Sequence, residues 1–241
     1  MDYKYNNKYF KDTGLIFLIG LILTAVGAIL FITFAVMYGN IFAPLFMIGP
    51  VLVIGVILMI FAKGGTLSDS EYDVQTKKLS ERLQERAMQK LNLEDRHIKM
   101  LAPITFTQYE FKDDPAKYKI KKGADGQIRS NYYVSAIFLF GQQQFYVYGN
   151  RLSLTDENEP NTDFNYTYKY SDLTAVELKD EKFTIKIKEK DLEIKYTTFN
   201  LLMDNSVILS IPSQSDAITD QKVIDMNKLI VKMRAKQEEN K

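Results

Sequence analysis

The chain contains one long apolar segment without charge, and this segment limits its fold more than any other feature. Residues 14–62 include no Asp, Glu, Lys, Arg or His, although 25% of the whole sequence is charged. A bilayer core of about 30 Å takes about 20 helical residues to cross, so 49 residues suffice for two crossings and are too many for one. Backbone amides in hydrocarbon must bond one another, so both crossings are expected to be helices.

A short break divides the apolar segment into two spans. Tyr38, Gly39 and Asn40 combine helix-stopping residues with an interfacial tyrosine, which leaves residues 14–37 and 41–62 as the spans of a transmembrane helical hairpin. Neither span contains an ionisable residue, Asn or Gln, so a transport role is not expected. A stripe of small residues predicts close contact, with Gly49 and Gly55 of the second span or with a second copy; its members are Gly20, Thr24, Gly27 and Ala28.

The flanking cations predict the orientation of the hairpin. Lysines precede the first span and follow the second, whereas the connecting loop has none, so both termini are expected in the cytoplasm of a multi-pass protein of the cell membrane. A cleaved signal peptide is the rival interpretation, but its apolar region is normally about 7 to 15 residues long. The leader also has the composition of an interfacial anchor, given by Tyr3, Tyr5, Tyr9 and Phe10.

Composition excludes several functional classes. The chain has no cysteine, which removes disulfides and thiolate chemistry, and its net charge of +1 gives little basis for nucleic-acid binding. No catalytic motif is present, so we expect no enzymatic activity, no cofactor and no metal. The single imidazole, His97, is expected to be a solvated or capping residue.

An amphipathic helix is expected directly after the hairpin. Ser68 and Glu71 form a capping-box pattern. The apolar positions after it recur at helical spacing to about residue 92 and comprise Tyr72, Leu79, Leu83, Ala87 and Leu91. Such a helix either rests one face on the following domain or forms a coiled coil or docking helix. The expected organisation is a leader (1–13), a hairpin (14–62), a linker with a stalk helix (63–97) and a β-rich domain (98–241).

The β-rich domain shows a period of two and ends with a helix. Alternation begins near Ile104 and turn residues follow about every 8 to 12 positions, which indicates antiparallel strands. Residues 131–140 are apolar at successive positions, so that strand is expected to be buried on both faces. Val223, Met226 and Ile230 share one side of a helix over about 216–233. The expected fold class is α+β.

Residues 131–233 resemble a known family. The stretch Tyr-Ser-Asp-Leu-Thr-Ala-Val at 170–176 is similar to a segment between two strands of the bacterial pleckstrin-homology-like (GRAM-like) domains, and the hairpins and terminal helix after it fit the same pattern. These domains are often tethered by paired membrane spans. The resemblance implies a cytoplasmic PH-like scaffold for lipids, peptides or partner proteins, and a scaffold does not fix a function by itself.

Two groups of residues are candidate binding sites. The first, here the basic set, is expected to contact lipid headgroups or to form a solvated hairpin; it comprises Lys112, Lys117, Lys119, Lys121, Lys122 and Arg129. The second, here the tyrosine row, is expected in a sheet core or on a partner-binding face; it comprises Tyr166, Tyr168 and Tyr170.

The sequence therefore favours a non-enzymatic, membrane-tethered adaptor. Its expected partners are membrane lipids and a membrane or cytoplasmic protein; self-association is left open and nucleic acid is not expected. The alternative is a protective membrane protein, such as a toxin or bacteriocin immunity factor, whose hairpin binds an intruder within the bilayer.

Overall fold

The computed structural model describes residues 1–39, 41–94, 97–98, 100–112, 114, 117–159, 161–187, 190–214 and 216–239. The chain divides into a helical unit, residues 2–72, and a mixed unit that contains residues 73–241. The predicted linker and stalk, residues 63–97, is therefore shared between the two units.

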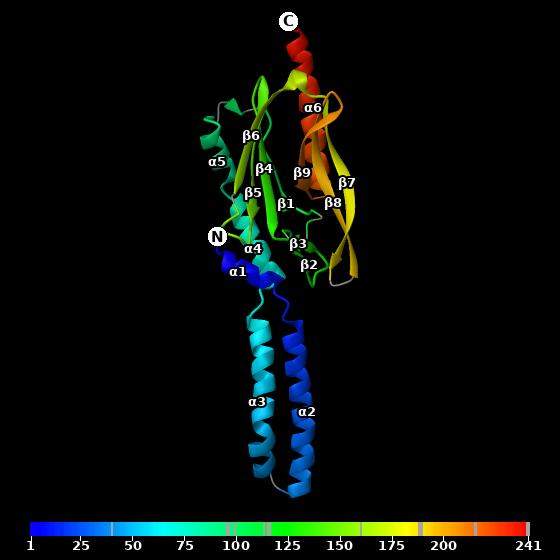
Figure 1. The fold of residues 1–241 in the computed structure, drawn as a ribbon. Coiled ribbons are helices and arrows are strands. Elements are labelled where there is room, and N and C mark those ends of the chain that lie inside the picture. The colour runs from blue at the N-terminus through cyan, green and yellow to red at the C-terminus, as the bar shows by residue number, and fades with distance from the viewer. Residues whose placement is uncertain are drawn as a thin grey trace. The chain divides into compact units, whose positions relative to one another are not determined.

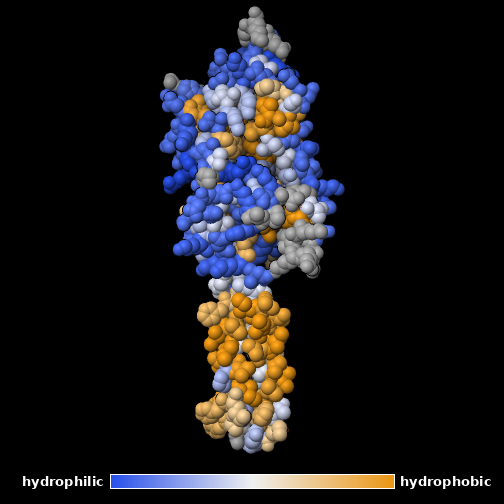
Figure 2. All heavy atoms as spheres, in the orientation of Figure 1, coloured by the Kyte–Doolittle hydropathy of each residue, from blue (hydrophilic) through white to orange (hydrophobic). Residues whose placement is uncertain are grey.

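Two long apolar helices dominate the helical unit. They are α2, Gly14–Tyr38, and α3, Phe42–Gly64, and both are long and apolar enough to cross a membrane (Figures 1 and 2). α2 ends at Gly39, whose φ of 62° is accessible at little cost only to glycine; Asn40, the last residue of the predicted turn, lies outside the described residues. Large side chains face outward along both helices, among them Val36 and Phe46.

The small-residue stripe brings α2 and α3 into close contact. A Cβ atom added to Gly20 would lie 2.8 Å from the carbonyl oxygen of Gly55, and one added to Gly27 would lie 3.1 Å from Cγ of Leu52. The predicted packing on Gly55 is thus confirmed. The predicted packing on Gly49 is wrong, because the nearest atom to its added Cβ is in Leu45 of its own helix, at 3.8 Å. Gly49 and Gly55 are six residues apart, which places them on different faces of a helix with 3.6 residues per turn.

The leader folds against the helix that follows α3. It forms α1, Tyr3–Asn7, and a 3₁₀ turn, η1, Lys8–Phe10. The Tyr9 ring is fully buried and stacks on Tyr72 at a centroid distance of 4.3 Å, and its hydroxyl donates to Asp69 at 2.8 Å. The leader tyrosine expected at a membrane interface is therefore a packing residue.

The predicted stalk is two helices, α4, Asp69–Ser80, and α5, Leu83–Lys90, because the helical geometry stops before Arg82, whose φ and ψ are −111° and 21°. The Arg86 guanidinium donates to the Leu79 carbonyl at 2.5 Å, which satisfies an acceptor at the end of α4. The capping box is confirmed, since the Ser68 N–H donates to the Glu71 carboxylate at 3.0 Å. Leu83 and Ala87 of α5 pack on Ile137, Leu139 and Tyr148 of the sheet, as expected for a helix resting on its domain.

The mixed unit contains two larger antiparallel sheets, a two-stranded antiparallel hairpin and a C-terminal helix, which confirms the α+β class (Figure 1). The first sheet has the order β1-β4-β5-β6, with β1 Ile104–Tyr109, β4 Tyr132–Phe140, β5 Gln144–Ser153 and β6 Thr162–Lys169. Its chain includes a small hairpin between β1 and β4, made of β2 Ile120–Lys122 and β3 Ile128–Ser130. After a 3₁₀ turn, η3 Tyr170–Asp172, the second sheet has the order β7-β8-β9, with β7 Ala175–Ile187, β8 Lys190–Met203 and β9 Ser206–Ser213. The helix α6 spans Ala217–Glu239.

One apolar core joins both sheets to α6. The Phe106 and Phe199 rings, from β1 and β8, stack at a centroid distance of 4.5 Å, and Phe138 of β4 meets the Phe199 ring at 5.0 Å. Met226 and Ile230 of α6 are buried in the same cluster. Every position of β4 is buried, as predicted, because this core covers one face and α5 the other.

A side chain of α6 bonds the backbone at the start of the free edge of β7. The Asn227 amide accepts from the Val176 N–H at 2.9 Å and donates to the Val176 carbonyl at 2.7 Å, as a neighbouring strand would. We expect Asn227→Leu to destabilise the chain by about 1–3 kcal/mol, because both backbone groups lose their partner. Urea unfolding followed by circular dichroism measures the effect. Gln221→Leu is the matched control, because the Gln221 amide is exposed and donates to Asp225 of its own helix. Equal losses of unfolding free energy in the two variants would contradict the role of Asn227 at the β7 edge.

Candidate binding groove

A groove of about 890 Å³ opens in the mixed unit between α4, β1, the β2–β3 turn and one end of β8 and β9. Its walls contain aromatic side chains, including Phe111 and Tyr196, beside charged ones of both signs. The Lys195 ammonium lies 3.1 Å from the Glu193 carboxylate, and the Asp216 carboxylate accepts from the Thr219 N–H at 2.7 Å. This mixed lining suits a ligand with both apolar and hydrogen-bonding groups.

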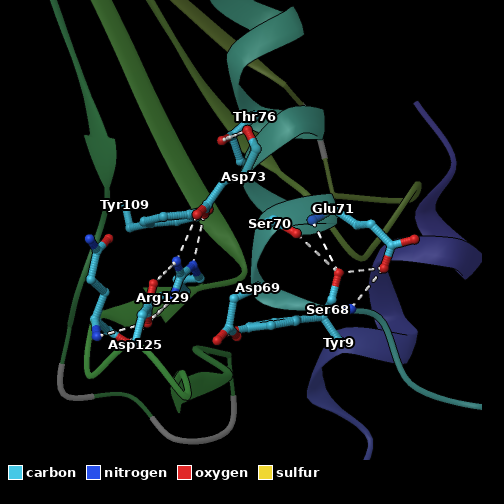
Figure 3. Close-up of polar contacts among 11 residues, drawn as sticks. Tyr9, Ser68, Asp69, Ser70, Glu71, Asp73, Thr76, Tyr109, Asp125 and Arg129 are labelled. Atoms are coloured by element: carbon cyan, nitrogen blue, oxygen red, sulfur yellow. Dashed lines mark hydrogen bonds and ion pairs between the residues drawn. The ribbon is translucent and has the colours of Figure 1, made fainter. Parts of the chain in front are cut away.

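A buried arginine organises the wall of the groove (Figure 3). The Arg129 side chain is 1% exposed and donates to two carboxylates. Its Nε and Nη2 bond Asp73 at 2.7 and 2.6 Å, while its Nη1 and Nη2 bond Asp125 at 3.0 and 2.7 Å. The Tyr109 hydroxyl adds a bond of 2.8 Å to Asp73. The cluster therefore ties α4, the end of β1, the β2–β3 turn and β3 together.

The electrostatics of this cluster favour fixed geometry over proton transfer. Hydrogen bonds from Arg129 lower the pKa of Asp125 to about 2. Burial, with the bond to Asp73, raises the pKa of Tyr109 far above the physiological range. Tyr109 is consequently a neutral donor and Asp125 a charged acceptor at any pH a cell would present. The arrangement suits a rigid recognition surface.

Acid should weaken this cluster over a narrow pH window. The Asp125 pKa is lower in the folded chain than its usual 3.8, so its contribution to stability is complete above about pH 4 and is lost as pH falls toward about 2. We expect Asp125→Asn to flatten the dependence of unfolding free energy on pH across this window. Urea unfolding at several pH values measures the slope. Asp204→Asn is the control because Asp204 lies in an exposed turn at φ 48°, which asparagine tolerates.

The basic set does not form one uniform surface. Arg129 is buried in the cluster described above, while Lys117 forms an ion pair with Glu159, and the Lys112 ammonium lies 3.4 Å from the Glu110 carboxylate. Lys119 and Lys122 are exposed, and Lys121 is half-buried. The β2–β3 hairpin itself is present, with Gly126 at φ 82° in its turn. Headgroup contact by these lysines stays a prediction.

The tyrosine row is split between the core and the surface. Tyr170 follows β6 in the turn η3, where its ring is fully buried and its hydroxyl donates to the Gly141 carbonyl at 2.9 Å. Tyr168 packs partly on the core, whereas Tyr166 is 43% exposed. Only Tyr166 of the three is thus available over much of its ring to a partner.

Two members of the groove, Asp73 and Tyr109, are absent from the sequence-based candidates. Neither residue carries a predicted role, and Arg129, which bonds Asp73, was expected among the lipid-facing or solvated residues of the basic set. Asp73 and Arg129 are 56 residues apart, so no local pattern joins them. His97 does cap locally, as expected, since its Nδ1 accepts from the Glu94 N–H at 3.1 Å.

The structure defines an α+β protein with two helices that are long and apolar enough to span a membrane and a β-rich unit that contains a groove. Among the described residues, no group of three or more His, Asp or Glu side chains could hold a metal ion. Comparison with protein-family models, with curated proteins and with solved structures finds no match to this chain.

Proposed function

We propose that this chain is a non-enzymatic binding protein, tethered in the cell membrane by a two-span hairpin, whose β-rich unit recognises a protein partner or lipid headgroups on the cytoplasmic side. The groove carries this proposal. It offers aromatic and polar side chains on a wall fixed by the Arg129 cluster. The lysines that flank the spans support cytoplasmic termini.

The two apolar helices support a tether better than a transport path. Their Thr24 and Thr33 hydroxyls donate to carbonyls of their own helix, Gly20 and Ile29, at 2.8 and 2.9 Å. Residues 14–37 and 41–62 contain no ionisable side chain to bind or relay an ion. A tether raises the effective concentration of partners in the same membrane, so weak contacts at the groove suffice for binding.

The order of the strands supports the PH-like resemblance. Within residues 131–233, the strands β4 to β9 are antiparallel and are followed by α6, which packs on their core, and this succession fits the hairpins and terminal helix of the resemblance. The strand β1 lies before that range and is an addition to it. The β2–β3 hairpin is an addition between the first two strands of the larger sheet.

Photo-crosslinking in intact membranes tests whether the groove binds a protein partner or a lipid. A benzophenone side chain replaces Gln127, an exposed residue of the groove, or as control Lys232, an exposed residue of α6 outside it. We expect a discrete adduct from position 127 alone, and its mass distinguishes a protein partner from a lipid. Equal labelling at both positions, or none at 127, would contradict a binding groove.

Exchange of the hairpin distinguishes a hairpin that only anchors the chain from one that belongs to a protective membrane protein and binds an intruder. Residues 14–62 are replaced by an unrelated two-span anchor, and the leader is retained because Tyr9 stacks on Tyr72. The adduct at position 127 should persist if the hairpin only localises the chain. Loss of the adduct in a folded, membrane-inserted chimera would favour a hairpin that itself recognises an intruding molecule.

A further inference from the structure

The strand β6 is an edge strand that the rest of the described chain leaves open. It pairs with β5 alone and ends the order β1-β4-β5-β6. Its positions are exposed except Phe164 and Tyr168, which are half-buried. Natural proteins usually cover such an edge, since its unpaired backbone groups are a template for another strand.

Side chains bond single residues at two other strand edges of this fold. Asn227 bonds both backbone groups of Val176 on β7. On β1, the Gln108 side chain accepts from the Tyr109 N–H at 2.9 Å. Within the part of the chain that the structure describes, no side chain bonds the backbone of residues 163–169 of β6.

The register of the sheet identifies which backbone groups of β6 face the open side. The Gly141 N–H donates to the Gln144 carbonyl at 3.0 Å, so the even-numbered residues of β5 bond β4. The odd-numbered residues of β5 therefore bond β6, and their partners are Thr162, Phe164, Tyr166 and Tyr168. Because the direction alternates along a strand, the N–H and C=O groups that face outward belong to Asp163, Asn165, Thr167 and Lys169.

The side chains of β6 complement themselves about Tyr166. When two copies pair antiparallel with Tyr166 opposite Tyr166, outward-facing residues meet outward-facing residues, as the ladder requires. Asp163 then lies opposite Lys169 of the second copy, Phe164 opposite Tyr168, and Asn165 opposite Thr167. A slip of one residue would mismatch the backbone groups, and a slip of two would separate Asp163 from Lys169.

We propose that the open edge of β6 binds a second copy of the chain, with the two β6 strands paired antiparallel across a two-fold axis at Tyr166. Opposite charges and aromatic pairs directly across antiparallel strands stabilise such a pair. An isologous contact of this kind closes with two copies and leaves no further edge at this site. The pairing needs neither the groove nor an identified ligand, so it stands apart from the proposed function.

Cysteine crosslinking tests the axis, because the chain has no cysteine of its own. At a non-hydrogen-bonded antiparallel pair the Cα atoms are about 4.5 Å apart, which is within the disulfide range. In full-length chain in membranes, Tyr166→Cys should form covalent dimers on mild oxidation at least about tenfold more than Asn165→Cys, which lies diagonal to its own copy. Equal yields, or a higher yield at 165, would overturn the proposal.

Charge and proline variants test the pairing without a crosslink. Lysine or glutamate at position 166 places like charges across the axis, so Y166K or Y166E alone should be monomeric in mild detergent, and an equal mixture of the two should dimerise. Thr167→Pro removes an outward N–H but no bond to β5, so it should abolish dimers while circular dichroism stays unchanged. Dimers that persist in T167P, or a mixture that stays monomeric, would overturn the proposal.

Discussion

Gly55→Val is expected to disrupt the helical hairpin, whereas Gly49→Val in the same helix is expected to have little effect. A Cβ atom at Gly55 would lie 2.9 Å from the Gly20 carbonyl oxygen and 2.9 Å from the Thr24 backbone nitrogen. Backbone atoms cannot rotate away as a flexible side chain does, so α2 and α3 must separate. Overpacking of this kind costs about 1–3 kcal/mol, and close packing is a main source of helix association in a bilayer.

The pair of variants isolates helix contact from a general effect of valine in an apolar helix. Both substitutions add the same atoms to α3, but an added Cβ at Gly49 meets only Leu45 of its own helix, at 3.8 Å. Unfolding of the purified full-length chain in mixed micelles, titrated with a denaturing detergent and followed by tyrosine fluorescence, gives the two midpoints. A loss at Gly49 equal to that at Gly55 would show that the contact between spans does not decide stability.

Composition was sufficient to predict the hairpin. A long apolar segment has few alternatives to two helices, and the ends of the predicted spans, 14–37 and 41–62, lie within two residues of the ends of α2 and α3. Alternation from Ile104 onward predicted antiparallel strands, and β7 and β8 pair antiparallel, with Ile185 opposite Leu192. These features depend on local periodicity, which a sequence records directly.

The stalk and the tyrosine row show where periodicity is insufficient. The apolar positions from Leu79 to Ala87 keep helical spacing across the break between α4 and α5, so the pattern does not reveal where the first helix ends. Tyr170 continues the alternation of β6 in sequence, yet the strand ends at Lys169 and the ring turns into the core. Tertiary contacts decide where a helix or strand ends, and the alternation of apolar residues does not reveal those contacts.

The candidate site was the least predictable part of the molecule. Arg129 belongs to a segment with five lysines, so a solvated or lipid-facing role followed from its neighbours in sequence. Its burial depends on Asp73 at a distance of 56 residues, and on Asp125 across the turn of its own hairpin. A buried guanidinium needs such partners, but a single sequence does not reveal which carboxylates supply them.

Arg129→Met is expected to lower the free energy of unfolding of the mixed unit strongly. Methionine fills much of the same space but donates none of the bonds to Asp73 and Asp125, and both carboxylates then remain beside each other without their cation. Breaking a buried ion pair costs about 3–5 kcal/mol. Here the two carboxylates are 42% and 40% exposed, so water compensates in part and we expect a loss near the lower end, about 3 kcal/mol.

An exposed arginine and a double-mutant cycle show whether this loss arises from the cluster. Arg82→Met removes an exposed guanidinium at the start of α5 and is expected to change the unfolding free energy by less than about 0.5 kcal/mol. Urea unfolding of the full-length chain, followed by circular dichroism, provides each value. Asp73→Asn should cost less in the Arg129→Met background than in the unmodified chain, because its partner is already absent. Additive losses of unfolding free energy for Asp73→Asn and Arg129→Met would contradict this role of the cluster, as would an equal loss for Arg82→Met. In either case the cluster does not hold α4 to β3, and the apolar core alone shapes the wall of the groove.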